Sequence, residues 1–383
     1  MTGGPHPRVP TLPALTSLRF VAAAYVLVFH YAAFYFDPAS IPQAIGLGYS
    51  GVTFFFVLSG FILAYTYRQA DLSTRETVAR FRWARVARVY PVYLLSLLIA
   101  LPWLAAWVVK TPPPLQGLMA ASAVLAPLGL HAWVPGAACA LDCPSWSIST
   151  EAFFYLAFPA LLPVVLRAPG RAAAATLVLW LAATALAILA WNRWAPGVSL
   201  IAPEGAGLGA QLLAQGIKYN PLLRLPEFVA GLLLYVVWTR VRLPVAGLLG
   251  TAALAALALV SAAPHLPVAP MHNGLTVLVW APLILAGAAI RSGPLVAPAA
   301  LFLGKISFAL YLLHTPAHAL LVTLDKVALG GRLGAAPWLA ASCATALALA
   351  AAAAMHLLVE EPARRRILAR VSGERAGAPL PSA

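Results

Sequence analysis

Ten stretches of about 20 mostly apolar residues, separated by charged or Pro/Gly-rich breaks, run through this sequence. A helix of about 20 apolar residues spans the ~30 Å hydrocarbon core of a bilayer. Because lipid offers the backbone no hydrogen-bonding partner, apolar spans of this length have to be helical. The sequence therefore predicts an all-α, polytopic integral membrane protein with about ten transmembrane helices. The expected spans are 14–36, 49–67, 82–109, 151–167, 173–193, 222–238, 244–262, 275–290, 300–324 and 336–359.

The composition excludes a water-soluble alternative. Hydrophobic residues make up 62% of the 383 residues and charged residues only 9%, whereas soluble domains carry about 25% charged residues. There are too few polar side chains to cover a particle in water, so lipid is the expected solvent. We expect residues 12–366 to form one transmembrane domain and residues 367–383 to form a disordered cytoplasmic tail.

One apolar segment, 115–130, is weaker than the others. It lies between a run of three prolines at 112–114 and Pro127, and proline breaks helices. We expect a re-entrant or interfacial piece here. A full crossing would invert every later span.

Basic residues orient the spans, because cytoplasmic loops carry an excess of Lys and Arg. Placing both chain ends in the cytoplasm puts 17 of the 25 basic residues on that side and 6 on the other, with Arg19 and Lys305 at membrane depth. Both termini are therefore predicted to be cytoplasmic. The cytoplasmic residues are Arg8, Arg68, Arg75, Arg80, Arg82, Arg85, Arg88, Arg167, Arg171, Arg240, Arg242, Arg291, Arg364, Arg365, Arg366, Arg370 and Arg375; the outer ones are Lys110, Arg193, Lys218, Arg224, Lys326 and Arg332.

The net charge of +14 reflects this orientation. Basic residues scattered over short loops do not build the continuous patch that nucleic acid requires. Nucleic acid is therefore excluded as a partner, and anionic lipid headgroups are expected instead. Cys139 and Cys143 lie in a predicted outer loop, where an oxidising compartment would allow a disulfide; no metal site is expected.

Polar side chains inside apolar spans are functional candidates, because each costs a few kcal/mol at membrane depth. Arg19 and His30 lie eleven positions apart in the first span. Eleven residues make about three helical turns, so both side chains share one face, roughly 16 Å apart along the axis. Alternatively, Arg19 reaches to lipid headgroups and His30 binds a neighbouring carbonyl.

Three arginines, Arg82, Arg85 and Arg88, enter the third span at a spacing of three. They form a slanting row on the helix, and guanidinium groups bind phosphate oxygens bidentately. A phosphorylated cytoplasmic cofactor would fit this row. An ordinary cytoplasmic membrane anchor is the alternative.

The segment Trp146–Glu151 opens the fourth span from the outer side. Ser147 or Ser149 could cap the helix, and a carboxylate suits its first turns. Because apolar residues follow Glu151 at once, we expect its side chain to face a polar partner inside the protein.

Later spans hold further polar candidates. Glu227 and Glu360 are carboxylates in or at the end of apolar segments. Ser307, Tyr311 and His314 are spaced by four and three residues and share one helix face. A side chain of this kind, taken alone, more often forms a hydrogen bond between helices than takes part in catalysis.

Seven landmarks, in this order, resemble the acyltransferase 3 family of bacterial membrane O-acyltransferases. They extend from residue 15 to about 366. The sequence departs from the family pattern at Thr16-Ser17, where Asp-Gly is usual, at Thr53, where Asp is common, and at Glu361, where a basic residue often precedes the proline. The landmarks are Leu15–Phe20 with Phe29-His30, Gly51–Phe61, Arg85–Pro91, Trp146–Glu151, Arg224–Gly231, Ile306–His314 and Val359–Pro362.

The resemblance implies an acyl-CoA-dependent O-acyltransferase of the inner (plasma) membrane. Members move acetyl or other short acyl groups from cytoplasmic acyl-CoA to hydroxyls of sugars, lipid-linked glycans, surface polysaccharides of the bacterial envelope or macrolide-like products. Acyl-CoA, with acetyl-CoA the expected donor, would be a co-substrate, and no permanently bound cofactor is expected. The essential arginine and histidine of the family correspond to Arg19 and His30, and the arginines associated with the donor correspond to Arg85 and Arg88, with Arg82 beside them.

Together these observations give one hypothesis for the site. His30 would take the proton of the acceptor hydroxyl, and Arg19 would steady the donor or the developing oxyanion. Glu151 would orient His30 or contact the acceptor. The expected substrate-binding residues are Trp146, Ser147, Tyr311, His314 and Glu227.

Two other functions are compatible with the same polar residues. A transporter or exporter of an envelope glycan precursor would also carry Arg, His and Glu at membrane depth, although the internal repeats and paired broken helices of many transporters are not visible. A scaffold within an envelope-polysaccharide complex would use its polar residues only to hold helices together.

Overall fold

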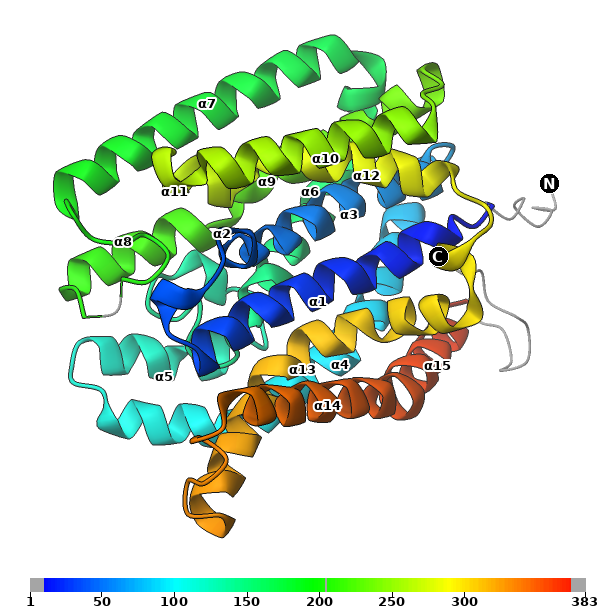
Figure 1. The fold of residues 1–383 in the computed structure, drawn as a ribbon. Coiled ribbons are helices and arrows are strands. Elements are labelled where there is room, and N and C mark those ends of the chain that lie inside the picture. The colour runs from blue at the N-terminus through cyan, green and yellow to red at the C-terminus, as the bar shows by residue number, and fades with distance from the viewer. Residues whose placement is uncertain (1–9, 204, 373–383) are drawn as a thin grey trace.

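The computed structural model describes residues 10–203 and 205–372 (Figure 1). Every regular element in this part of the chain is a helix, and ten helical stretches are long and apolar enough to cross a membrane. Each expected span corresponds to one of these ten. The prediction of an all-α, multi-pass membrane protein is confirmed.

Fifteen α-helices follow one another along the described chain. They are α1 (Pro13–Tyr35), α2 (Gln43–Gly46), α3 (Gly51–Tyr67), α4 (Arg75–Lys110), α5 (Leu115–Leu125), α6 (Trp146–Arg167), α7 (Pro169–Trp194), α8 (Leu208–Tyr219), α9 (Pro221–Arg240), α10 (Val245–Ala262), α11 (Val268–Pro270), α12 (Val277–Ala289), α13 (Pro298–Ala328), α14 (Pro337–Met355) and α15 (Glu361–Ser372). Tight 3₁₀ turns lie at Pro38–Ser40, Gly48–Ser50, His131–Trp133, Cys143–Ser145, Ala263–His265 and Pro294–Val296, and wider π-type turns at Met271–Leu275 (η6) and His356–Glu360 (η8).

Small residues let the central helices approach closely. Gly60 of α3 lies against Gly231 of α9, and a Cβ at either position would fall well inside van der Waals contact with the partner's backbone. Gly304 of α13 lies in the same way against the backbone of Thr16 in α1. Because lipid supplies no hydrophobic force between helices, such close packing is what stabilises their association. The α1–α13 contact is the one that carries the site described below.

The short helix α5 is too short to cross a membrane by itself. Its 11 residues extend over only about 16 Å, roughly half of the hydrocarbon core. It packs beside α4, whose Tyr90 and Tyr93 donate hydrogen bonds to the carbonyls of Pro127 and Ala126 just after α5. This agrees with the expectation that 115–130 is not a full crossing.

The described chain begins and ends at the same end of the helix bundle (Figure 1). Tyr65, at the end of α3, donates to the carbonyl of Pro10 (2.9 Å), and Arg291, just after α12, donates to that of Thr11 (3.3 Å). The last helix, α15, packs against α4. An even number of crossings requires this arrangement.

The C-terminal helix continues past residue 367, where the disordered tail was expected to begin. α15 runs to Ser372 because it packs on α4, and Glu361 pairs with Arg365 one turn later (2.8 Å). The remainder of the expected tail, 373–383, lies outside the described residues.

The glycine contact between α3 and α9 gives a first prediction. Gly231→Ala should lower the melting temperature of the detergent-purified protein, because overpacking a tight contact costs about 1–3 kcal/mol. Gly250→Ala in α10 is the matched control: the space around Gly250 is open, and alanine there improves helix propensity by about 1 kcal/mol. Equal melting temperatures of the two variants would contradict the tight α3–α9 contact.

Candidate active site

His30 of α1 and His314 of α13 form a hydrogen-bonded pair. Nδ1 of His30 lies 2.8 Å from Nε2 of His314, and the two rings meet edge to edge, with centroids 5.0 Å apart and planes 23° apart. His314 is completely buried, whereas His30 is partly exposed. The sequence placed these residues in separate groups, and the structure joins them.

Aromatic and phenolic side chains surround this pair. The hydroxyl of Tyr31 donates to the backbone carbonyl of His314 (2.8 Å). One turn further out, Nδ1 of His318 lies 2.8 Å from the hydroxyl of Tyr35, and Phe34 stacks on the His318 ring at 4.2 Å. Sequence reasoning missed His318, Tyr31 and Tyr35, although His314 and His318, like Tyr31 and Tyr35, are spaced by one helical turn.

Glu151 belongs to a different group from His30. Its Oε1 accepts hydrogen bonds from Ser59 of α3 (2.9 Å) and from Tyr155 (2.5 Å), and its charge acts on Arg19. Among the described residues, no hydrogen bond joins Glu151 to His30. The expectation of a polar partner inside the protein is met, but the geometry does not support orientation of His30 by this carboxylate.

A cationic cluster, Arg19, Arg85, Arg88 and Arg364, lies at the end of the bundle where the chain begins and ends. Arg88 lies within electrostatic range of the other three arginines. The arginines come from α1, α4 and α15. Four guanidiniums outnumber three nearby carboxylates, Glu151, Glu360 and Glu361, the last of which pairs with Arg364 at 3.8 Å. Such a surplus favours an anionic ligand.

The members of the expected arginine row take different positions. The guanidinium of Arg85 lies 6.0 Å from the ring centre of Tyr155, and its buried Nε has no hydrogen-bond partner among the described residues. Arg82 is instead exposed and lines a shallow surface groove with Arg75 and Trp83. The structure therefore groups Arg85 and Arg88 with Arg19 and leaves Arg82 apart.

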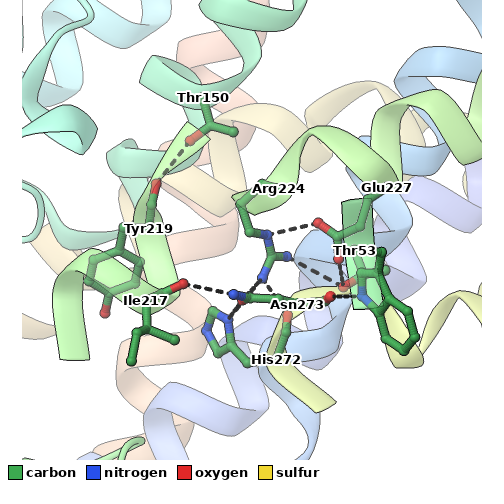
Figure 2. A network of polar contacts seen from close by, with 9 residues as sticks. Thr53, Thr150, Ile217, Tyr219, Arg224, Glu227, His272 and Asn273 are labelled. Atoms are coloured by element: carbon green, nitrogen blue, oxygen red, sulfur yellow. Dashed lines mark hydrogen bonds and ion pairs between the residues drawn. The ribbon is translucent and has the colours of Figure 1, made fainter. Parts of the chain in front are cut away.

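A buried ion pair forms a second polar network (Figure 2). Arg224 and Glu227 of α9 are 0% and 1% exposed, and Nε of Arg224 lies 2.7 Å from Oε2 of Glu227. Thr53 of α3 donates to the other carboxylate oxygen (2.7 Å). The Arg224 guanidinium also binds His272 and the side-chain oxygen of Asn273 (2.8 Å). Glu227, expected to contact substrate, is held by protein partners on both oxygens.

This network lies where the eighth span is interrupted. In η6, Asn273 and Gly274 leave the helical backbone conformation, with φ of +114° at Gly274. The carbonyl of Asn273 accepts from Trp180 (2.6 Å), and its side-chain amide donates to the carbonyl of Ile217 (2.7 Å). Backbone groups freed by a break at membrane depth need internal partners, and this network supplies them.

Trp146, Ser147 and Tyr311 are buried around the start of α6. The Trp146 ring lies 5.5 Å from the Arg224 guanidinium, while Ser147 (2.9 Å) and Tyr311 (3.0 Å) both donate to the carbonyl of Pro144. The expected caps at Ser147 or Ser149 are wrong, because α6 starts at Trp146 and its first residues are already helical. These hydroxyls bind nearby backbone carbonyls instead.

Asp142 links the loop before α6 to α13, next to the histidine pair. Cys139 and Cys143 are disulfide-bonded, as the sequence allowed. Oδ1 of buried Asp142 accepts from Thr315 (2.8 Å), the residue after His314, while Oδ2 has no hydrogen-bond partner among the described residues. Burial raises the pKa of the Asp142 carboxyl to about 7, and the Thr315 hydroxyl opposes part of that rise.

Comparison with known proteins gives one family match and two related proteins. A family model described as an acyltransferase domain matches residues 12–357. The chain is 30% identical to "Acyltransferase MdmB" of Streptomyces mycarofaciens over 384 residues, covering 94% of this chain and 93% of that protein. It is 37% identical to "Protein 2 in picA locus" of Rhizobium radiobacter over 106 residues, covering 27% of this chain and 52% of that protein. No solved structure matches.

Asp142 makes stability depend on pH. An unfolded Asp loses its proton near pH 4, whereas the folded carboxyl keeps it to about pH 7. The folded state therefore binds more protons in this window, so the stability due to Asp142 falls as pH rises from about 4 to about 7. Asp142→Asn keeps an acceptor for Thr315 but cannot ionise.

Thermal unfolding of both proteins at pH 5.5 and pH 8 checks this. The melting temperature of the wild type should fall more between the two pH values than that of D142N. Other titrating groups, including buried His131, affect both proteins and cancel in the comparison. Identical pH dependence would show that Asp142 is not a buried titrating group.

Proposed function

The chain belongs to the acyltransferase 3 family, and on this premise we propose that it is a membrane O-acyltransferase that uses cytoplasmic acyl-CoA. The acyl group is acetyl or another short chain, and the acceptor is a hydroxyl of a sugar, glycolipid, surface polysaccharide or macrolide-like molecule. The observation that carries the proposal is a histidine pair about 16 Å along α1 from a cationic cluster. Family membership favours a transferase over the transporter and the scaffold.

The proposal places the cationic cluster on the cytoplasmic side of the plasma membrane. The 17-to-6 split of basic residues supports this orientation. Acyl-CoA is made and used in the cytoplasm, so its phosphates would meet Arg19, Arg85 and Arg88 there. Guanidinium groups match phosphate geometry, and the buried Nε of Arg85 has no hydrogen-bond partner among the described residues. Arg82, which lies apart, is not assigned to the donor.

The acyl group then has to reach His30. The pantetheine arm would extend along α1 from Arg19 to His30, about 16 Å along the helix axis. The partly exposed His30 would accept the proton of the acceptor hydroxyl while the oxygen attacks the thioester carbonyl carbon. The C–S bond breaks, and the coenzyme A thiolate leaves and takes up a proton.

The acceptor would approach from the opposite, outer side. Trp146, Ser147 and Tyr311 lie around the loop that joins Asp142 to the start of α6. Glu227 has both carboxylate oxygens occupied by protein groups, so its role in this scheme is to hold Arg224 and not to bind substrate.

Lysine substitutions test donor binding. Arg85→Lys with Arg88→Lys keeps both charges but loses the bidentate fork, so the KM for acetyl-CoA should rise about tenfold, equivalent to about 1.4 kcal/mol. Arg82→Lys, an exposed arginine of the same helix, is the matched control and should leave KM unchanged. An unchanged KM in the double variant would show that the acyl donor does not bind this cluster.

Removal of the His30 imidazole tests the chemistry. The transfer rate of His30→Ala should be about 10²- to 10⁴-fold lower, because positioned proton transfer usually accelerates a reaction by that factor. The rate is followed as transfer of label from [14C]acetyl-CoA into products of a cell-envelope extract, per unit of protein that elutes as a folded peak. His318→Ala removes a neighbouring imidazole and should retain most activity. If H30A transfers label at the wild-type rate, His30 is not the base.

A further inference from the structure

We infer that His314 is the positioning residue of His30, holding it in the one tautomer that can act as a base. This inference rests on the proposed function, in which His30 takes the proton of the acceptor. The carrying observation is the 2.8 Å contact between Nδ1 of His30 and Nε2 of His314. A single proton lies between these two nitrogens. Whether it is bonded to His30 or to His314 decides whether the opposite nitrogen of His30, Nε2, has a free lone pair.

Two arrangements of that proton are possible. If His314 donates from Nε2, the neutral His30 carries its own proton on Nε2 and cannot accept another there. If His30 donates from Nδ1, its Nε2 keeps a free lone pair. Only the second arrangement makes Nε2 of His30 a base, and it requires Nε2 of His314 to be the acceptor.

The surroundings of His314 favour the second arrangement. As an acceptor at Nε2, the neutral ring must carry its proton on Nδ1. Nδ1 is buried and has no hydrogen-bond partner among the described residues, while the backbone carbonyls of Leu310 and Tyr311, four and three residues earlier in α13, interact electrostatically with the ring. Carbonyl oxygens stabilise a ring N–H and not a ring lone pair.

The His314 ring is also fixed in place. It is fully buried, its carbonyl accepts from Tyr31, and its ring lies within 23° of the plane of the His30 ring. No carboxylate is hydrogen-bonded to either ring within the described part of the chain. In the serine-protease triad an aspartate holds the catalytic histidine in its tautomer; here a second imidazole would do so, and without adding a negative charge.

Two amide substitutions separate positioning from packing. Glutamine extends its terminal oxygen to the place of Nε2 of histidine, whereas asparagine reaches only the place of Nδ1. His314→Gln can therefore accept from His30, and His314→Asn cannot, although both are polar amides. We expect kcat of H314N to fall about 10- to 100-fold, as when other histidine-orienting partners are removed, while H314Q retains most of its kcat and KM for acetyl-CoA is unchanged in both.

The outcomes distinguish this inference from the proposed function. If H314N keeps the wild-type kcat, or if folded H314Q is as slow as H314N, His314 does not position His30, while the His30→Ala result still decides the proposed function. The double variant H30A/H314N should be no slower than H30A alone, because residues that act as one unit are not additive.

A measurement on the wild type keeps the inference testable if H314N does not fold. In protein labelled with 15N-histidine, the chemical shifts of His30, assigned by difference from His30→Gln, report which ring nitrogen carries the proton. We expect a protonated Nδ1 and an unprotonated Nε2. The opposite tautomer would overturn the inference.

Discussion

The ion pair between Arg224 and Glu227 holds the interrupted part of the bundle together. Burying two unpaired charges would cost several kcal/mol for each ion, but here each charge meets the other at 2.7 Å and further donors or acceptors surround both. The same guanidinium binds η6, where the backbone of the eighth span departs from the helical conformation. α3, α9 and α12 are thereby fixed to one another, and Trp146 packs over the guanidinium at the start of α6. The remaining spans are arranged around this frame.

Two polar regions of different character lie about 16 Å apart along α1. The cationic cluster gathers arginines from α1, α4 and α15, with fewer carboxylates than guanidiniums. The histidine pair is surrounded by phenol and phenyl rings and has no hydrogen-bonded carboxylate in the described part of the chain. One region attracts negative charge, and the other provides bases and hydroxyls without fixed charge. A reaction between an anionic donor and an uncharged hydroxyl needs both.

The sequence predicted the features that depend on neighbouring residues. Spans follow from local hydropathy, and the grouping of Arg85 with Arg88 follows from their spacing on one helix. The Arg224–Glu227 pair, at i and i+3, was also within reach of that reasoning, although only Glu227 was singled out. In contrast, the His30–His314 contact joins positions 284 residues apart, and Asp142 reaches Thr315 through a loop closed by a disulfide. Neither contact has a periodic signature, because each depends on which helices become neighbours in the bundle.

The order of helices along the chain also decides when the histidine pair can first exist. His30 lies in the first span and His314 in the ninth, so a nascent chain that has inserted α1 through α12 still lacks half of the pair. Gly304 of α13 must also pack against the backbone of Thr16 before the two rings can form their hydrogen bond. A ribosome therefore has to release nearly the whole polypeptide into the bilayer before the pair is complete. Partly synthesised or C-terminally truncated chains would carry the arginines of α1 and α4 but no assembled histidine pair.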